Sequence, residues 1–296
     1  MSVFKDHKIS LKQVLEFVPE ALLSHLSATT KVDYYSKVLH GKKMFYLLLF
    51  CIFDNEKLSQ RTLEDTFNSS GFKALFGLGE EEKVRRSSIS ERLSKIDSHY
   101  FKEIYEQMYG RFSELYSKSE IEKYNLIRVD STIVADTCNK LKEGIDQKSG
   151  KKLVKFSFSF DGILPSGVEV FTAQKYSSEE SALPQAILKH TLKEIGHDNI
   201  YIIDRGLQST RAMKEFDEQS IKFIIRSKEN RKFEEIETYL DVENPLKWED
   251  WRLVKDSKVK LFTGKPILNK RGNIHHREEK VETEFRLVII KNEKTN

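Results

Sequence analysis

Two aspartates in this sequence adjoin strand-like runs, at positions where a carboxylate could do chemistry. Asp130 lies inside the run Tyr124–Asp136, which has the length and the β-branched content of a strand. Strand interiors disfavour aspartate, so a purely structural role explains Asp130 poorly. Asp204 follows the apolar run Asn199–Ile203 and opens the tripeptide Asp-Arg-Gly. On its own, Asp204 would be interpreted as a turn residue or a helix cap.

The two aspartates become informative together if their strands are neighbours. Carboxylates placed side by side repel each other unless a cation neutralises them. Mg²⁺, or Mn²⁺ in its place, prefers such hard oxygen ligands, and two ions about 3.5–4 Å apart can hold the attacking and leaving oxygens of a phosphodiester. We therefore expect Asp130 and Asp204 to be catalytic residues and metal ligands for phosphodiester chemistry.

The elements around the aspartates predict that the two strands are indeed neighbours. Three strand-like runs come first, and the turn signals between them favour an antiparallel meander. Helix, strand, helix and strand patterns then follow. In chain order the runs are 124–136, 153–160, 167–174, 181–196, 199–204, 209–219 and 221–227. This order predicts an α/β fold with a mixed sheet, in the ribonuclease-H-like arrangement, where the first and fourth strands are adjacent.

Residues 1–120 are predicted to form a helical N-terminal domain with a possible role in DNA binding. Short helical runs around a glycine-containing connection, between residues 58 and 96, are compatible with a helix-turn-helix that enters DNA. An ordinary helical bundle explains the same pattern, because this region is not clearly basic. The apolar run Met44–Phe53 has ten residues. A membrane span needs about 20, so we expect a buried helix and no membrane partner.

The rest of the chain is predicted to contain two further parts. Residues 121–230 form the first part of the ribonuclease-H-like core, and residues 231–296 form a β-rich insertion that is incomplete at its C-terminal end. The segment Leu253–Lys280 is the most basic of the chain, with eight Lys/Arg and three Asp/Glu. Contact with phosphate explains this bias. A solvated edge strand protected by lysines explains it equally well.

Composition excludes several classes of protein. The chain is 39% hydrophobic and 32% charged, which is typical of a globular protein and not of a disordered one. Its net charge of +4 permits a nucleic-acid partner without requiring one. Cys51 and Cys138 define no disulfide framework, and the N-terminus lacks a signal peptide, so we expect a cytoplasmic location. No glycine-rich nucleotide-binding loop is present.

The two aspartate motifs also resemble those of a known family. Asp130-Ser131-Thr132 in a strand, followed after about 70 residues by Asp204-Arg205-Gly206, is similar to the DDE transposases of bacterial insertion sequences, and most of all to the insertion-sequence-four group. The resemblance covers most of the chain. It implies Mg²⁺-dependent cleavage and strand transfer on double-stranded DNA, with inverted-repeat ends and a target as partners. It also implies a homodimer in a synaptic complex.

The sequence departs from this family at the third acidic residue. In the family, a catalytic glutamate lies on a helix with the motif Tyr-x2-Arg-x3-Glu-x6-Lys, which is not found here. The later glutamates lack the Tyr, Arg and Lys partners of that motif; they are Glu278, Glu279, Glu282 and Glu284. We therefore expect a partial transposase chain with weak metal binding. A ribonuclease-H-like nuclease and an inactive DNA-binding remnant are the alternatives.

The remaining acidic and histidine candidates are expected to be structural. Asp136 and Asp161 are interpreted as turn or strand-end residues. His190 and His197 flank the end of the helix predicted over 181–196. None of these four needs a catalytic role.

Overall fold

The computed structural model describes most of the chain as two compact units. The described residues are 17–54, 58–115, 125–135, 143–162, 164–194, 198–240, 246–268 and 274–294. The first unit is Met1–Ser117 and the second is Lys118–Asn296. None of the helices in the described residues is long and apolar enough to cross a membrane.

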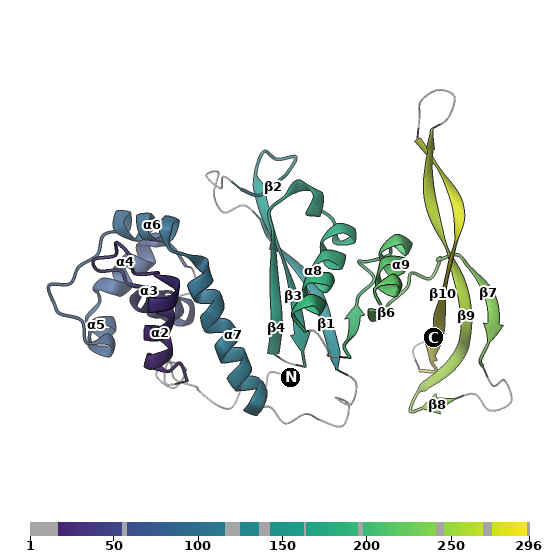
Figure 1. Ribbon diagram of the computed structural model, residues 1–296, viewed down its shortest axis with the longest axis horizontal. Coiled ribbons are helices and arrows are strands. Elements are labelled where there is room, and N and C mark those ends of the chain that lie inside the picture. Colours follow the sequence, from purple (N-terminus) through teal and green to yellow (C-terminus); the bar gives the residue numbers. More distant parts are fainter. Residues whose placement is uncertain are drawn as a thin grey trace. The chain divides into compact units, whose positions relative to one another are not determined.

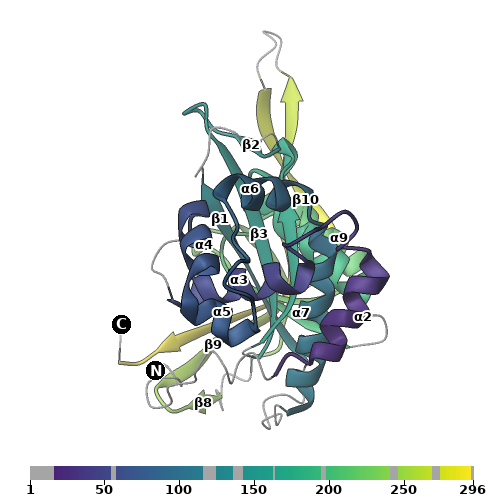
Figure 2. The ribbon, with the colours of Figure 1, turned by 90° about the vertical axis from the view of Figure 1, so that its left-hand side faces the viewer.

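The described part of the first unit is helical and has its own hydrophobic core. The helices are α2 (Glu20–Thr30), α3 (Gly41–Asp54), α4 (Gln60–Asn68), α5 (Ser70–Phe76), α6 (Arg86–Lys95) and α7 (Ser98–Leu115). Helix α3 carries the apolar run of the sequence and lies among the other helices (Figures 1 and 2). Its residues Met44, Leu47 and Cys51 are fully buried, so this run is a core helix as predicted.

Helix α5 is a structural feature that the sequence did not predict. The segment between α4 and α6 is rich in turn-forming residues, yet its first half is helical. Ser69 caps α5 by accepting a hydrogen bond from the backbone N–H of Phe72, at 3.2 Å. The Phe72 side chain is 1% exposed within the core. Burial of one large aromatic ring and a serine cap therefore outweigh the turn-forming composition.

The second unit contains a six-stranded mixed sheet in the predicted order. Its strands are β1 (Leu126–Ala135), β2 (Ile145–Asp146), β3 (Lys152–Asp161), β4 (Leu164–Phe171), β5 (Ile200–Ile203) and β6 (Lys222–Ile225). The strands run side by side in the order β2-β3-β1-β5-β6, and β4 also pairs with β3. Strand β3 is antiparallel to β1, whereas β5 and β6 run parallel to β1. This is the ribonuclease-H-like order, with the first and fourth major strands adjacent.

Two helices complete this α/β core. Helix α8 (Glu179–Lys193) connects β4 to β5, and α9 (Thr210–Glu218) connects β5 to β6 (Figure 1). Helix α8 begins at Glu179, two residues before its predicted start near Ser181. Glu179 and Glu180 suit the first turn because the helix dipole favours negative charge there. Apolar side chains of α8, α9, β1 and β5 form one buried cluster.

Strand β3 alternates between polar and aromatic side chains, and its polar face is the one that is buried. Its buried side chains are Lys155, Ser157 and Ser159, at 1%, 1% and 4% exposure. Phe156 and Phe158 point to the other face and are only partly buried. The small serines allow α8 to pack closely on this strand. Alternation fixes the period of a strand but not which of its faces is covered.

A second, four-stranded sheet follows β6. It comprises β7 (Phe233–Thr238), β8 (Lys247–Trp248), β9 (Trp251–Leu268) and β10 (Ile274–Asn292), and β9 and β10 form a long antiparallel hairpin (Figure 1). Met213 of α9 packs on Val259 and Leu261 of β9 in a separate apolar cluster. The β-rich character predicted for residues 231–296 is therefore seen in the described residues.

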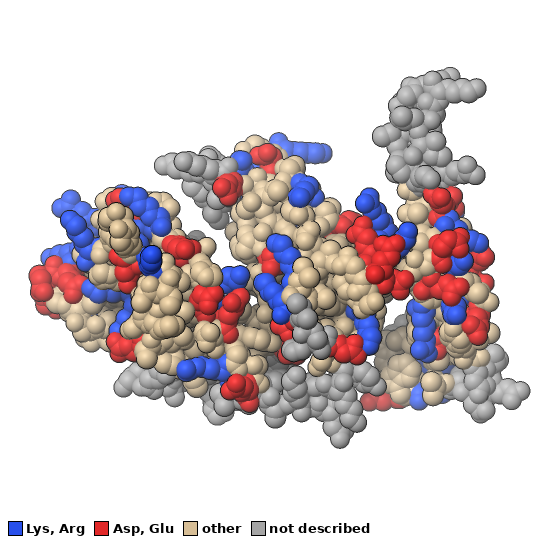
Figure 3. All heavy atoms as spheres, viewed as in Figure 1, with Lys and Arg blue, Asp and Glu red and all other residues tan. Residues whose placement is uncertain are grey.

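Where β9 lies between β7 and β10, over Ser257–Leu261, the basic segment of the sequence is neither an edge strand nor a free cationic patch. On this part of the sheet, Lys255 and Lys258 pair with glutamates of β7, and Lys258 and Lys260 pair with glutamates of β10. Lys260 contacts Glu282 at 2.7 Å and Lys258 contacts Glu284 at 3.3 Å. Figure 3 shows Lys/Arg and Asp/Glu side chains interspersed over this sheet. Cross-strand ion pairs account for the lysines on this part of β9.

Candidate active site

Strand register brings Asp130 and Asp204 to equivalent positions on two neighbouring strands. The parallel pairing of β1 with β5 ends with Val129 opposite Ile203. The next residue on each strand is an aspartate, and both aspartates are exposed. Because adjacent strands lie about 4.8 Å apart, the two carboxylates begin from neighbouring backbone positions. Strand β1 continues beyond this point by pairing with β3 alone, so Asp130 lies inside a strand while Asp204 starts a turn.

Each carboxylate is oriented by one backbone hydrogen bond. The N–H of Ser131 donates to Oδ1 of Asp130 at 2.8 Å, and the N–H of Gly206 donates to Oδ1 of Asp204 at 2.6 Å. Among the described residues, no protein hydrogen bond to either Oδ2 atom is observed. Two adjacent carboxylates with free oxygens are a donor set that fits Mg²⁺ or Mn²⁺ completed by water. The described residues contain no group of three or more His, Cys, Asp or Glu that could hold a metal ion.

Gly206 is required by the close approach of the Asp204 carboxylate. A Cβ atom at this position would lie 2.8 Å from Oδ1 of Asp204. The backbone of Gly206 is not in the left-handed region, unlike that of Gly150. The reason for glycine in the Asp-Arg-Gly tripeptide is therefore space and not conformational freedom.

The turn after Asp204 is held by the hydrophobic core, by Glu180 and by Arg231. Leu207 is fully buried in the core between the sheet and its helices. The Glu180 carboxylate accepts hydrogen bonds from the backbone N–H groups of Gln208 and Ser209, at 2.7 and 2.8 Å. Arg231 donates to the backbone carbonyl of Gln208 at 3.0 Å. Such a turn holds its first residue, Asp204, with little freedom.

Beneath the turn lies an ion pair between Lys155 and Glu179. Nζ of Lys155 lies 3.1 Å from Oε1 of Glu179 and donates to the Ser177 carbonyl at 3.0 Å. Lys155 is 1% exposed, and lysine is almost never fully buried unless it is paired. Oε2 of Glu179 is buried without a hydrogen-bond partner among the described residues. The stem of Glu179 lies next to Gly206.

Arg205 follows Asp204 directly, where its guanidinium could contact a DNA phosphate or pair with a carboxylate. Arg205 is exposed, and no ion pair to its guanidinium is observed within the described residues. An exposed guanidinium on the residue after Asp204 is suited to contact a phosphate group in a bidentate manner. Its exposure leaves it accessible to such a group.

The later glutamates lie on the second sheet, among lysines. Glu278 contacts Lys232 at 2.6 Å, and Glu282 and Glu284 belong to the cross-strand pairs described above. Glu279 also lies on β10 and has an interaction partner. These carboxylates therefore form part of the ion-paired surface of the second sheet.

The other candidates of the sequence have structural surroundings or fall outside the described residues. Asp136 and His197 fall outside them. Asp161 is the last residue of β3, where it pairs with Ile127 of β1. His190 is 4% exposed and lies in a buried polar network.

The network around His190 uses both of its ring nitrogens. Nδ1 lies 3.0 Å from the Tyr201 hydroxyl, and Nε2 lies 3.1 Å from the Ser166 hydroxyl. Thr191 donates to the Tyr201 hydroxyl at 2.9 Å. Burial lowers the pKa of His190, and the charge of Glu194 opposes this shift only in part. His190 is therefore a neutral bridge between α8 and the sheet.

Sequence reasoning missed the residues that support Asp204, namely Lys155, Glu179, Glu180 and Arg231. One signal for them was present: Lys155 shares the face of a strand with two serines, on the side that proved to be covered. Glu179 and Glu180 precede the helix predicted over 181–196, so the sequence pattern gave them no role. Their contacts with a turn nearly thirty residues later depend on the path of the chain, which local patterns do not reveal.

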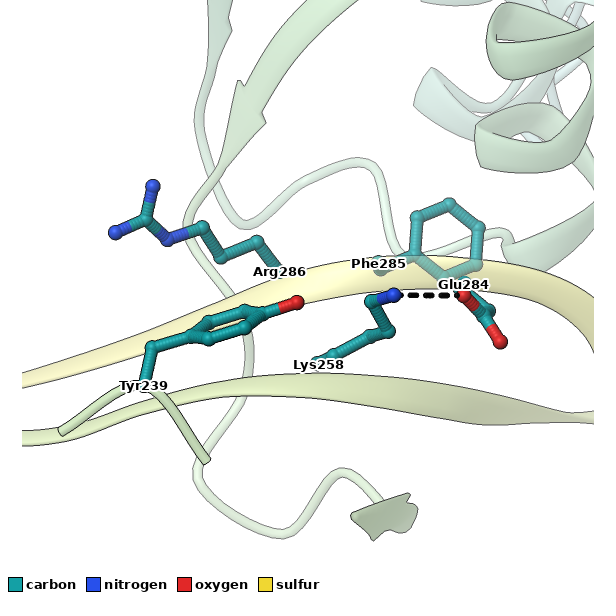
Figure 4. A pocket seen from close by; sticks show the side chains of 5 residues that line it. All are labelled: Tyr239, Lys258, Glu284, Phe285 and Arg286. Atoms are coloured by element: carbon teal, nitrogen blue, oxygen red, sulfur yellow. Dashed lines mark ion pairs between the residues drawn. The ribbon is translucent and has the colours of Figure 1, made fainter. Parts of the chain in front are cut away.

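An open hollow of about 480 Å³ is found on the second sheet (Figure 4). It is lined by Tyr239, Lys258, Glu284, Phe285 and Arg286. Arg286 forms a bidentate pair with Asp256, at 2.8 and 2.6 Å, and lies over the Tyr239 ring. The charged groups that line the hollow are thus already paired, and no lining residue comes from the first sheet.

Comparisons with known proteins found only distant structural similarities. No protein-family model matches the sequence, and no curated protein matches it. Among solved structures, the chain is similar to the piggyBac transposase synaptic complex with hairpin DNA, at 11% identity and a TM-score of 0.37. That match covers 93% of this chain, which spans 62% of the length of the piggyBac chain.

Two further structures are complexes of Mos1 transposase. The paired-end complex with the left transposon end matches at 9% identity and a TM-score of 0.27, and the Mos1 mariner paired-end complex with Mn matches at 10% and 0.24. Each covers 74% of this chain and 79% of the Mos1 chain. Scores this low do not define a fold, so the ribonuclease-H-like assignment depends on the strand order and pairing described above.

Proposed function

We propose that the chain is a DNA transposase of the DDE type, with Asp130 and Asp204 as two of its catalytic acids. The observation that supports this most strongly is their register. Two aspartates occupy equivalent positions where a central parallel strand pair of a ribonuclease-H-like sheet separates. A pair of adjacent exposed carboxylates has no stabilising role of its own, because the two anions repel each other.

In the proposed mechanism the protein positions a divalent cation and a phosphodiester. Asp130 and Asp204 would hold the cation through their free oxygens, and Arg205 would bind a non-bridging phosphate oxygen of the DNA. When bound, Mg²⁺ or Mn²⁺ activates water or a 3′-hydroxyl and stabilises the leaving oxygen. The Asp204 turn stays fixed while the DNA is exchanged, because its contacts come from the core.

The finer part of the proposal is membership of the insertion-sequence-four group. Both aspartate motifs and a β-rich segment after β6 support it. The partners would be double-stranded DNA, as inverted-repeat ends and target, bound by a homodimer in a synaptic complex. Because the Tyr-x2-Arg-x3-Glu-x6-Lys motif is absent from these residues, we propose that this is a partial chain and that the third acid comes from outside it. Two carboxylates alone should then bind the cation weakly.

The test is a strand-transfer assay with a pre-cut 3′-hydroxyl DNA end, in Mg²⁺ and in Mn²⁺. Slow joining of the end to target DNA, in keeping with the missing third acid, is the expected result, and Asp130→Asn or Asp204→Asn should abolish it. Hydrolysis without joining would instead identify a nuclease. DNA binding that neither variant changes, with no metal-dependent nicking, would identify a non-catalytic remnant. Melting curves of both variants serve as the control for folding.

A further inference from the structure

We propose that Glu179, held by buried Lys155, is a positioning residue that aligns the Asp204 carboxylate for cation binding. The inference rests on the proposed function, since it concerns the same cation site. The helix dipole accounts for an acid at Glu179, but it does not account for the pairing of this acid with a buried lysine.

The topology places the start of α8 at the edge of the sheet where Asp204 lies. Strands β4 and β5 both run parallel to β1, because β3 is antiparallel to β1 and to β4. Helix α8 connects the end of β4 to the start of β5, so it runs back along the sheet. Its first residue, Glu179, therefore lies at the carboxyl edge of β5, beside the turn that Asp204 opens.

At this edge, Glu179, Gly206 and Asp204 lie close enough together for a movement of Glu179 to affect Asp204. A Cβ on Gly206 would meet both Oδ1 of Asp204, at 2.8 Å, and Cγ of Glu179, at 3.6 Å. Oδ1 of Asp204 and the stem of Glu179 thus lie on the same side of Gly206, next to its backbone. The same Gly206 donates its N–H to Asp204. A shift of Glu179 would therefore move the group that orients Asp204.

The charges explain why this support is an ion pair. Lys155 neutralises Glu179 through Oε1, which lets a third carboxylate lie near the site without adding its full charge to that of Asp130 and Asp204. Oε2 of Glu179 remains without a protein partner although it is buried. A buried acceptor without a partner is costly, and such atoms commonly bind an ordered water.

A direct consequence is a measurable effect of Glu179→Gln on the cation site. Carboxylates that orient metal ligands from outside the ligand shell typically change metal affinity by 10- to 100-fold when they are removed. We expect Glu179→Gln to weaken Mn²⁺ binding to the full chain about tenfold. We also expect the amide proton resonance of Gly206 to move, because its hydrogen bond to Asp204 changes.

The matched control is Glu169→Gln. Glu169 of β4 is 17% exposed and pairs with Lys189 of α8 at 2.7 Å, so it also joins this helix to this sheet by an ion pair. It contacts Lys189 and Lys193, toward the other end of α8. If the Lys155–Glu179 pair only stabilises the fold, both variants will lower the melting temperature alike. Neither would then change Mn²⁺ affinity or the Gly206 resonance, and that result would overturn the proposal.

A second variant covers the case in which Glu179→Gln fails to fold around an unpaired lysine. The double variant Lys155→Met/Glu179→Leu removes both charges, and such replacements of buried ion pairs are often neutral or stabilising. It should fold, weaken Mn²⁺ binding and move the Gly206 resonance. Unchanged Mn²⁺ affinity and an unchanged resonance would contradict the role of Glu179. If the wild-type chain binds no Mn²⁺, the proposed function fails, and the Gly206 resonance still decides whether Glu179 positions Asp204.

Discussion

Single atoms decide whether Asp130 and Asp204 can share a cation. Each has one carboxylate oxygen fixed by a backbone N–H. Gly206 links the site to its support, because it donates to Asp204 and lies beside the stem of Glu179. The contacts around the two aspartates are short, so one added methyl group would displace a carboxylate.

Replacing Gly206 by alanine tests this close packing. The new Cβ would lie 2.8 Å from Oδ1 of Asp204, so the carboxylate must move. We expect Gly206→Ala to weaken Mn²⁺ binding. The control is Gly110→Ala in α7, where no atom lies within 4 Å of the added Cβ. That change should stabilise the protein by about 1 kcal/mol through helix propensity and leave Mn²⁺ binding unaltered. Equal Mn²⁺ affinity in the two variants would refute the packing argument.

Histidine 190 should make the second unit sensitive to mild acid. Its pKa is lowered in the folded state by burial, from a usual value of 6.5. Above that pH the ring is neutral in both states. As the pH falls below 6.5, the unfolded chain binds the proton first, so the free energy of unfolding decreases until the folded pKa is reached.

The measurement is the melting temperature between pH 7.5 and pH 5. We expect His190→Gln to reduce the loss of stability on acidification. His25→Gln, at an exposed position of α2, should leave that loss unchanged. Parallel curves for the wild type and His190→Gln would show that this histidine does not control the acid response.

The element scale explains how distant residues meet. Parallel pairing of β1 with β5 aligns the aspartates, and the crossover through α8 brings Glu179 and Glu180 to the same edge. In the second sheet, Lys260 of the central strand β9 lies opposite Glu284 of β10 and Glu234 of β7. The charged residues of a strand therefore predict a binding partner only after the charges on the neighbouring strands are known.

The lysines of β9 should contribute little to DNA binding. Each of Lys255, Lys258 and Lys260 is paired with a glutamate, and exposed pairs of this kind are worth about 0–1 kcal/mol each. We expect the triple change to glutamine to leave the salt dependence of DNA affinity unaltered. Arg205→Gln, by contrast, should reduce the salt slope by about one unit, as expected for one lost phosphate contact. A larger reduction for the triple variant would place DNA on the second sheet.

The sequence was most informative where a pattern is local. The strand and helix order of residues 124–227 was predictable because alternation, length and turn residues act over a few positions. The orientation of β3 was not, because either face of an alternating strand can be covered. The supports of Asp204 were not predictable either, because Glu180 meets Gln208 only after the chain has passed through α8 and β5.

At the scale of the whole molecule, the two units have separate cores. The first is built from helices around α3, and the second is built around α8, α9 and the first sheet. No side chain belongs to both clusters among the described residues. Each core should therefore respond to mutation by itself.

Two truncations of fully buried side chains test this independence. Leu47→Ala in α3 should destabilise the first unit by about 2–5 kcal/mol, and Phe216→Ala in α9 should destabilise the second by about 3–5 kcal/mol. Both residues are 0% exposed. Hydrogen exchange read unit by unit should show lost protection only in the mutated unit. Loss across both units from either change would indicate one cooperative core.

The central claim is that Asp130 and Asp204 share one divalent cation, and Mn²⁺ titration tests it most directly. The Mn²⁺ affinity of the wild type is compared with that of Asp130→Asn, Asp204→Asn and the double variant. The control is Asp198→Asn. Asp198 lies just before β5, is exposed, and pairs with Lys222 of β6. If the two aspartates hold the same ion, each single variant loses the binding and the double variant loses no more than either. Undiminished binding in either single variant, or losses that simply add, would contradict a shared cation site.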